Sequence, residues 1–226
     1  MYLCAQMIVT FEQTYLQELY TEGKASDKRH RFQPQIVSKY IKVVNLMKQQ
    51  ENVLGLTKYG SLHYEKLHGD KEGISSVRVN DQYRIEFTEG MEAGKQIATI
   101  CNITELSNHY KDMTTLEGVK PQMIANNLKP FQPTHPGEVL KDELEYRGIS
   151  QRGLAKEIGI SYSAFNEMLN GKRSLSPELA MMMEAALGVD AAPLLAMQNE
   201  YDMLMAERDD TFMEKLTRIR RIAAVL

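Results

Sequence analysis

The sequence has only two cysteines, Cys4 and Cys101, and no long hydrophobic run. Their wide separation is not the paired spacing of a metal site, and so few thiols cannot form a disulfide framework. A reducing, cytoplasmic setting is therefore expected. A membrane-spanning helix needs about 20 consecutive apolar residues, and no stretch approaches that length, so no membrane partner is expected. The sequence predicts neither a metal nor a cofactor.

An excess of positive charge is also missing. The formal net charge is −3, with 14 Lys and Arg against 14 Asp and Glu in residues 1–112 and 13 against 16 in residues 113–226. Nucleic acids attract proteins through clustered cations. Neither half is a generally basic protein, so any contact with DNA or RNA must come from local clusters.

The segment 149–173, ISQRGLAKEIGISYSAFNEMLNGKR, has the pattern of two short helices joined by a tight turn. Ser150 and Ser161 are candidate N-caps, and Gly159 stands where a left-handed residue would end the first helix. This is the pattern of a helix-turn-helix, although an ordinary helical hairpin in an all-α core has similar spacing. Polar residues at the helix starts and rims favour DNA binding. They are Gln151, Arg152, Ser161, Tyr162, Ser163, Asn166, Lys172 and Arg173.

Residues 1–112 have the pattern of a small α+β domain. Apolar periodicity predicts strands at 7–11, 64–67, 75–79, 82–87 and 97–103, helices at 14–20 and 35–50, and a mobile stretch at 52–61. A strict two-residue loop at Asn80-Asp81 would mix the two faces of the hairpin. A three-residue loop places Arg78 opposite Arg84 and keeps Val77 and Ile85 on the core face. We therefore expect the second register, with Glu86 on the same outer face as the arginines.

Residues 113–133 have the composition of a linker, with Pro121, Pro130 and Pro133 as breakers. Residues 134–226 have no strand pattern and predict helices at 136–147, 151–158, 161–169, 177–187, 193–206 and 210–225. Thr134, Ser176 and Asp190 are candidate caps for three of them. The last two helices each have a narrow apolar stripe. Those stripes predict folding back onto the helical core or, alternatively, a dimer seam or a toxin contact.

Two segments resemble a known toxin family, and a third resembles its antitoxins. LHGDKEGISSVRVNDQYRIEF at 67–87 and ITELSNHY at 103–110 resemble HigB toxins of the RelE/ParE superfamily. THPGEVLKDELEYRGISQRGLAKEIGIS at 134–161 resembles HigA antitoxins with an Xre-type, lambda-repressor-like helix-turn-helix. The resemblance covers nearly the whole chain. It implies an α+β toxin domain at 1–112, a linker at 113–133 and an all-α antitoxin domain at 134–226, joined by natural fusion or by engineering.

Toxins of this family are metal-independent endoribonucleases that cut mRNA, usually on the ribosome. The resemblance thus implies attack of a 2′-hydroxyl on the adjacent phosphate, which needs a base, an acid and stabilising cations. Arg78 and Arg84 suit the cation role, although either could belong to a solvated face. His109 and Tyr110 match the His-bearing end of HigB toxins, where histidine can exchange a proton and tyrosine can stack on a base. The remaining candidates are His68 or His63 as a second acid or base, and His63, Lys66 and Lys71 as RNA contacts.

The sequence departs from the HigB pattern in two ways. The usual aspartate before the terminal histidine is absent, because the chain reads Ser107-Asn108-His109. The toxin-like half is also neutral, whereas a ribosome-directed toxin is expected to be basic. Both departures favour an alternative reading, in which the N-terminal half is a catalytically inert interaction domain of a transcription regulator.

The antitoxin resemblance implies that the second helix of the 149–173 unit enters the major groove. Ser161, Tyr162, Ser163 and Asn166 would reach base edges, and Gln151, Arg152, Lys172 and Arg173 would contact phosphates. Tyr162 could equally pack against the scaffold. One such module binds weakly, so a homodimer on a palindromic operator is expected, with repression of the chain's own promoter.

Joining the two halves keeps their local concentration near the order of millimolar. The sequence therefore predicts a latent ribonuclease that is held inactive by its own antitoxin domain, or by that of a neighbouring copy.

Overall fold

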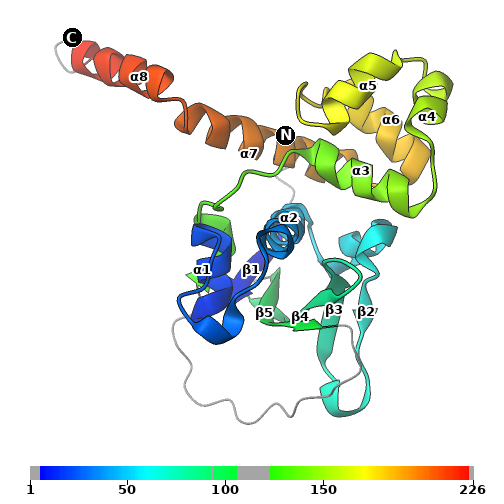
Figure 1. Cartoon of the computed structure of the whole chain (residues 1–226), viewed down its shortest axis with the longest axis vertical. Helices are drawn as coiled ribbons and strands as arrows, with labels where there is room; N and C mark the ends of the chain where they lie inside the picture. The colour runs from blue at the N-terminus through cyan, green and yellow to red at the C-terminus, as the bar shows by residue number, and fades with distance from the viewer. Residues whose placement is uncertain (1–5, 93, 106–122, 224–226) are drawn as a thin grey trace.

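The computed structural model describes residues 6–92, 94–105 and 123–223. The described residues up to Glu105 are here called the sheet domain. Together with the later strand β6, they form a sheet with strand order β2-β3-β4-β5-β1-β6. Two helices pack against this sheet at β1 (Figure 1). The elements are β1 (Ile8–Phe11), α1 (Thr14–Glu22), α2 (Pro34–Gln49), β2 (Glu65–Lys66), β3 (Ile74–Arg78), β4 (Tyr83–Glu92), β5 (Lys95–Glu105) and β6 (Met123–Ile124). The predicted α+β pattern is confirmed, because strands and helices occur where the apolar periodicity places them.

The hairpin of β3 and β4 has the expected register. Arg78 is directly opposite Arg84, and Val77 is opposite Ile85. The amide of Val79 donates to the carbonyl of Tyr83 at 2.8 Å, which closes the three-residue loop. Glu86 differs from the expectation of a solvated outer position, because it is only 3% exposed.

The stretch at 52–61 was predicted to be mobile, and that prediction is wrong. It forms two 3₁₀ turns, η2 (Val53–Lys58) and η3 (Gly60–Leu62), and the Asn52 side chain caps the first by accepting from the Leu54 amide. Val53, Leu56 and Leu62 of these turns are buried. Glycines therefore mark tight packing here rather than mobility.

Residues 123–133, here called the strap, lie along the sheet domain. Met123 and Ile124 pair antiparallel with Phe11 and Thr10. The Asn126 side chain accepts from the Val9 amide at 2.9 Å and donates to the Met7 carbonyl at 3.0 Å. The part of the predicted linker that the structure describes is thus attached to the outer edge of the sheet. The predicted domain limits at 112 and 133 stay predictions.

Residues 134–223, here called the helical domain, are all described by the structure, and their regular elements are helices. They are α3 (Pro136–Tyr146), α4 (Gln151–Glu157), α5 (Tyr162–Leu169), α6 (Pro177–Leu187), α7 (Ala191–Glu207) and α8 (Asp210–Ala223). Ser150, Ser161 and Ser176 cap α4, α5 and α6 as expected. All six predicted helices are present.

One predicted cap is wrong, and another, Asp190, stands at the N-cap position of α7 but makes no cap bond with its side chain. His135, not Thr134, caps α3: its Nδ1 accepts from the Gly137 amide, and Glu138 completes a capping box. Thr134 instead accepts from the Asn45 side chain, and Asp190 pairs with Lys58. Both residues are thus used in contacts between the domains.

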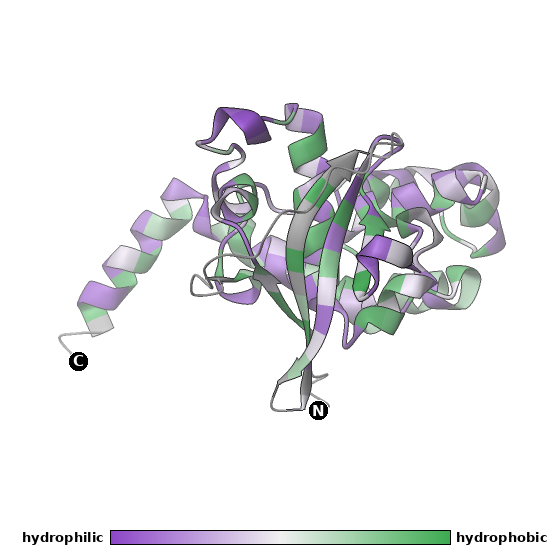
Figure 2. Ribbon diagram, turned by 90° about the horizontal axis from the view of Figure 1, so that it is seen from below, coloured by the Kyte–Doolittle hydropathy of each residue, from purple (hydrophilic) through white to green (hydrophobic). Residues whose placement is uncertain are grey.

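The two domains pack against each other through α3 and α7, which lie on α2 and the turn η3 (Figure 1). The apolar stripe of α7 is buried there, with Leu194 and Met197 almost fully covered. Helix α8 instead extends away from the body (Figure 2), and its stripe residues Phe212 and Ile219 are 40% and 50% exposed. The expectation that both stripes fold back onto the core is wrong for α8. Helix α7 packs on α3 and α6 of its own domain and also on α2, so it has both the expected core packing and the alternative contact with the toxin-like half.

Candidate functional site

The helix-turn-helix presents its polar residues together on one surface. Ser161, Tyr162 and Ser163 at the start of α5 are exposed, and Asn166 lies one turn further on. The Asn166 amide donates to the Gln151 side chain at 3.3 Å, and the Arg152 guanidinium lies 5.1 Å from the centre of the Tyr162 ring. These two contacts tie the start of α4 to α5. They orient four of the predicted residues toward the same side.

The scaffold beneath this surface is well packed. Phe165, Met168 and Leu169 of α5 are fully buried, and Gly159 has φ +73°, as a left-handed end to α4 requires. Lys172 and Arg173 are exposed after α5, and Arg173 forms a loose ion pair with Glu167 at 3.4 Å. Tyr162 is 42% exposed, so its ring is available despite the contact with Arg152.

A second candidate site lies on β2, β3 and β4, and is here called the arginine face. Arg78 and Arg84 are neighbours across the β3–β4 ladder, and Ser76 lies between Glu65 and Glu86 in the next row. His63 reaches this face from the end of η3. Lys71, from the turn η4 (Gly69–Lys71), reaches Glu86. The predicted cations are therefore brought together, but with carboxylates among them.

Each predicted cation on the arginine face has a carboxylate partner. Arg84 pairs with Glu65 at 2.7 Å, Lys71 pairs with Glu86 at 2.7 Å, and Arg78 pairs with Asp81. The Glu86 side chain is 4% exposed, so its charge is removed from water and held by Lys71. An RNA phosphate would have to displace at least one of these carboxylates before it could use both arginines.

His63 joins the two arginines. Its Nε2 lies 3.0 Å from Arg78 Nη1, and its carbonyl accepts from Arg84 Nη2 at 2.9 Å. A guanidinium only donates, so Nε2 accepts and the ring proton is on Nδ1. His63 is also the one non-glycine residue with positive φ in the described ranges, at +43°. It is therefore held in a strained backbone conformation at the centre of the candidate site.

The remaining predicted residues are not gathered at this centre. His68 and Lys66 are exposed, before η4 and on β2 respectively. His109 and Tyr110 lie outside the described residues. Within the described ranges, no group of three or more His, Cys, Asp or Glu could hold a metal ion. None of the described helices is long and apolar enough to cross a membrane.

The packing between the domains reaches the arginine face. Glu143 of α3 is fully buried and accepts from the amides of Gly60 and Ser61 at 3.2 and 2.8 Å. The Tyr146 ring, one turn later, lies edge-on to the His63 ring at 4.9 Å. Arg147 compensates the buried charge by binding Glu143 and the Lys58 carbonyl. The helical domain thus contacts the segment that carries His63.

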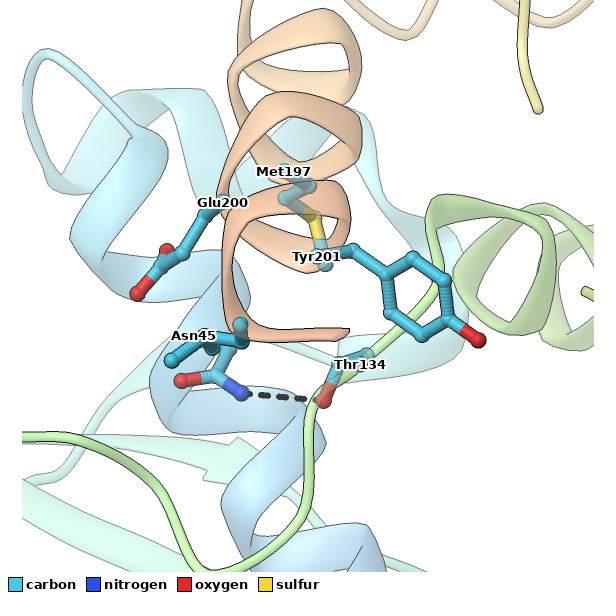
Figure 3. A pocket seen from close by; sticks show the side chains of 6 residues that line it. Asn45, Thr134, Met197, Glu200 and Tyr201 are labelled. Carbon is cyan, nitrogen blue, oxygen red and sulfur yellow. Dashed lines mark hydrogen bonds between the residues drawn. The ribbon is translucent and has the colours of Figure 1, made fainter. Parts of the chain in front are cut away.

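A second polar cluster fixes α7 to α2 (Figure 3). Lys48 and Gln49 donate to the two oxygens of Glu200 at 2.7 and 2.6 Å, and the Lys48 side chain is only 4% exposed. Asn45 donates to Thr134 and accepts from Tyr20, and burial raises the pKa of the Tyr20 hydroxyl. These contacts join α1 and α2 to the helical domain over a small pocket beside Tyr201.

Sequence reasoning placed Glu86 on the face of the arginines, but it missed their partners Glu65 and Asp81 and the α3 residues that hold the 60–63 turn. Glu86 had a signal, because it alternates with Arg84 on one strand. Glu65 had none, since its strand is two residues long. Glu143 and Tyr146 look like ordinary helix positions, and only the packing between the domains gives them a role.

Comparison with protein families matches both halves. A family described as RelE-like toxin of type II toxin-antitoxin system HigB matches residues 9–100, and a helix-turn-helix family matches residues 140–194. The chain is also similar to virulence-associated protein I of Dichelobacter nodosus, with 40% identity over 76 residues that cover 33% of this chain and 70% of the relative.

Two solved structures are similar as well. One is an addiction module antidote protein of a HigA family from Coxiella burnetii, at 32% identity, a TM-score of 0.34 and coverage of 37% of this chain and 94% of that chain. The other is the Pseudomonas aeruginosa antitoxin HigA with the higBA promoter, at 28% identity, a TM-score of 0.34 and coverage of 35% and 88%. By the two family matches, residues 9–100 belong to the HigB-like toxin family and residues 140–194 to a helix-turn-helix family, so the chain joins a HigB-like toxin domain and a helix-turn-helix domain in one polypeptide.

Proposed function

We propose that this chain is a fused toxin–antitoxin whose sheet domain is a latent mRNA endoribonuclease, and whose helical domain restrains it and represses its own promoter. The observation that carries the proposal is the use of different helices for the two tasks. Helices α3 and α7 hold the sheet domain, while the polar start of α5 stays exposed. One chain can therefore be restrained and bind operator DNA at the same time.

In the proposed reaction, Arg78 and Arg84 stabilise the charge that develops on the phosphate when the 2′-hydroxyl attacks. His109, with His68 or His63 in support, exchanges the protons, and Tyr110 stacks on a base. Lys66, Lys71 and His63 bind the RNA chain. The substrate is mRNA on the ribosome, and no metal takes part.

Growth arrest in cells tests the restraint. We would express residues 1–133, which keep the strap on the sheet, beside the same fragment with His109→Ala and beside the full chain. Arrest by the fragment, relieved in both other cases, is the expected result. A fragment that is folded, as judged by circular dichroism, and that causes no arrest would refute a latent toxin.

Binding of the chain to its own promoter tests repression. Asn166→Ala and Tyr162→Ala should each weaken specific binding by about 1–3 kcal/mol, because they remove base contacts. Lys172→Ala and Arg173→Ala should each lower the salt slope by about 1 without changing base preference. The exposed Lys156 on α4 supplies a matched control, since Lys156→Ala should change neither quantity. We propose that a homodimer makes these contacts on a palindrome.

One observation favours a second candidate function. All three described cations of the arginine face are paired with carboxylates, which suits an interaction domain better than a site open to RNA. In that case the chain is a DNA-binding regulator with an inert HigB-like domain. The fragment would then fail to arrest growth, while promoter binding would persist.

A further inference from the structure

The 60–63 turn is fixed from the side of the helical domain. Glu143 accepts both from Gly60 and from Ser61, and it is fully buried. Tyr146 lies directly on the turn, since a Cβ added at Gly60 would be 2.4 Å from Tyr146 Cε1. Two side chains of one helix therefore hold both the backbone and the outer surface of this turn.

The same turn ends in His63, whose backbone is left-handed. A non-glycine residue keeps such a conformation only when its surroundings enforce it. The surroundings of His63 are the Tyr146 ring on one side and the two arginines on the other. The contact with α3 therefore helps to hold His63 in the position from which it contacts the two arginines.

The arginine donors are occupied as a result. Arg84 donates from Nε to the Ser76 hydroxyl, and from Nη2 to the His63 carbonyl and to Glu65. Arg78 donates from Nη1 to the His63 ring and from Nη2 to Asp81. Arginine binds a phosphate best with two parallel donors of its planar fork. Neither guanidinium offers such a pair while His63 stays in place.

We propose that α3 restrains the arginine face through the 60–63 turn, by holding His63 where its ring and carbonyl occupy Arg78 and Arg84. When α3 leaves the turn, His63 relaxes from its left-handed conformation and releases Arg78 Nη1 and Arg84 Nη2. An RNA phosphate then has only the exposed carboxylates Asp81 and Glu65 left to displace from the two guanidinium groups. The inference rests on the proposed function only in that the bound RNA would be cleaved. The control of RNA binding by α3 does not depend on cleavage.

The test uses the full chain and a short 2′-O-methyl RNA, which lacks the attacking hydroxyl and cannot be cleaved. Tyr146→Ala removes a half-exposed ring and leaves the rest of the domain packing intact. The apparent affinity of a site is reduced by the fraction of molecules in which that site is open. If about one molecule in ten of the unchanged chain is open and Tyr146→Ala opens most of them, the variant should bind this RNA about tenfold more tightly. Fluorescence anisotropy measures the difference.

Asp142→Ala is the matched control. Asp142 lies on the same helix and pairs with Lys42 of the sheet domain, but it does not touch the 60–63 turn. We expect its affinity for the RNA to stay close to that of the unchanged chain. Adding Arg84→Ala to Tyr146→Ala should abolish the gain. Glu143→Gln, which weakens the hold on the two amides, is a second variant that should change the affinity in the same direction.

Equal affinity of Tyr146→Ala, Glu143→Gln and the unchanged chain would overturn the proposal. So would an equal gain from Asp142→Ala, because that would indicate general loosening of the domains. Cleavage of an unmodified mRNA on translating ribosomes is measured in parallel. Tighter binding without cleavage would support the role of α3 and refute the proposed ribonuclease, so the two failures can be told apart.

Discussion

His135 caps α3 with an imidazole nitrogen, which works only while that nitrogen carries no proton. Burial lowers the pKa of His135, and the nearby Asp202 carboxylate offsets this only in part. The folded chain therefore keeps His135 neutral at a pH where the unfolded chain, with an ordinary histidine pKa near 6.5, already takes up a proton. Stability from this residue is complete above that value and is lost as the pH falls below it.

The resulting prediction concerns pH and the free energy of unfolding. Between pH 7.5 and pH 5.5 (values chosen to span about one unit on either side of the ordinary histidine pKa), the unchanged chain should lose more stability than His135→Asn. Asparagine is a good N-cap with no charge to gain. Urea unfolding at the two pH values measures this. Parallel losses in both proteins would contradict the role assigned to His135.

At Gly137, α3 approaches the backbone of α5 closely. A Cβ at this position would lie 2.2 Å from the Met168 carbonyl oxygen and 2.9 Å from the Leu169 Cα, and neither backbone atom can move aside cheaply. Gly137→Ala should therefore destabilise the chain by about 1–3 kcal/mol through overpacking. Thermal unfolding is the measurement, with Glu145→Ala on the exposed side of α3 as the control. A melting temperature as high as that of the control would show that the helices separate easily.

At the scale of elements, the short strand β6 of the strap is held by its contacts with β1 and the residue before it. Asn126 bridges the amide of Val9 and the carbonyl of Met7, which lie on either side of the β1 start. Asn126→Ala removes both bonds and leaves partly buried backbone groups without them, so a loss of about 1–3 kcal/mol is expected. The adjacent Asn127 is exposed, and Asn127→Ala should change stability little. Hydrogen exchange at Val9 would show whether the loss is local to the strap.

The helices of this chain could be predicted from the sequence because their signals are local. Ser150, Ser161 and Ser176 cap the helices that they precede, and the apolar periodicity of α2 and α5 appears in their own residues. The register of Arg78 and Arg84 was also predictable, since one face of the hairpin must be buried. Strand β6 could not be predicted, because its two residues depend on pairing with β1, more than a hundred positions earlier.

The residues of the candidate sites can also be divided into those with a local signal and those placed by contacts between distant segments. The exposed start of α5 was predictable from cap and rim residues, and Glu86 from its alternation with Arg84, whereas the pairing of Glu65 with Arg84 was not. Glu65 reaches Arg84 only through the pairing of β2 with β3, and Glu143 reaches Gly60 only through packing of the domains. Contacts that depend on the arrangement of distant segments have no periodic signal in one sequence.

At the scale of the whole molecule, the packing of the domains contains a buried charge. The Lys48 side chain is 4% exposed, and Glu200, on the other domain, holds its ammonium group. Glu200→Ala would leave that charge unpaired, which should cost about 2–4 kcal/mol. The chain should then unfold over a broader urea range, because the domains separate before either unfolds. Glu207→Ala, which breaks the exposed pair with Lys129, should cost less than about 1 kcal/mol. Equal effects of the two variants would contradict a structural role for the buried pair.

Because the HigB-like domain and the helix-turn-helix domain share one backbone, they are always made in equal number. Synthesis or degradation of one partner cannot shift a ratio that is fixed at translation. Gene dosage changes both domains together, so abundance carries no information about whether the sheet domain should be active. A signal that acts on this protein has to change the docking of α3 and α7, or cut the chain between the strap and α3.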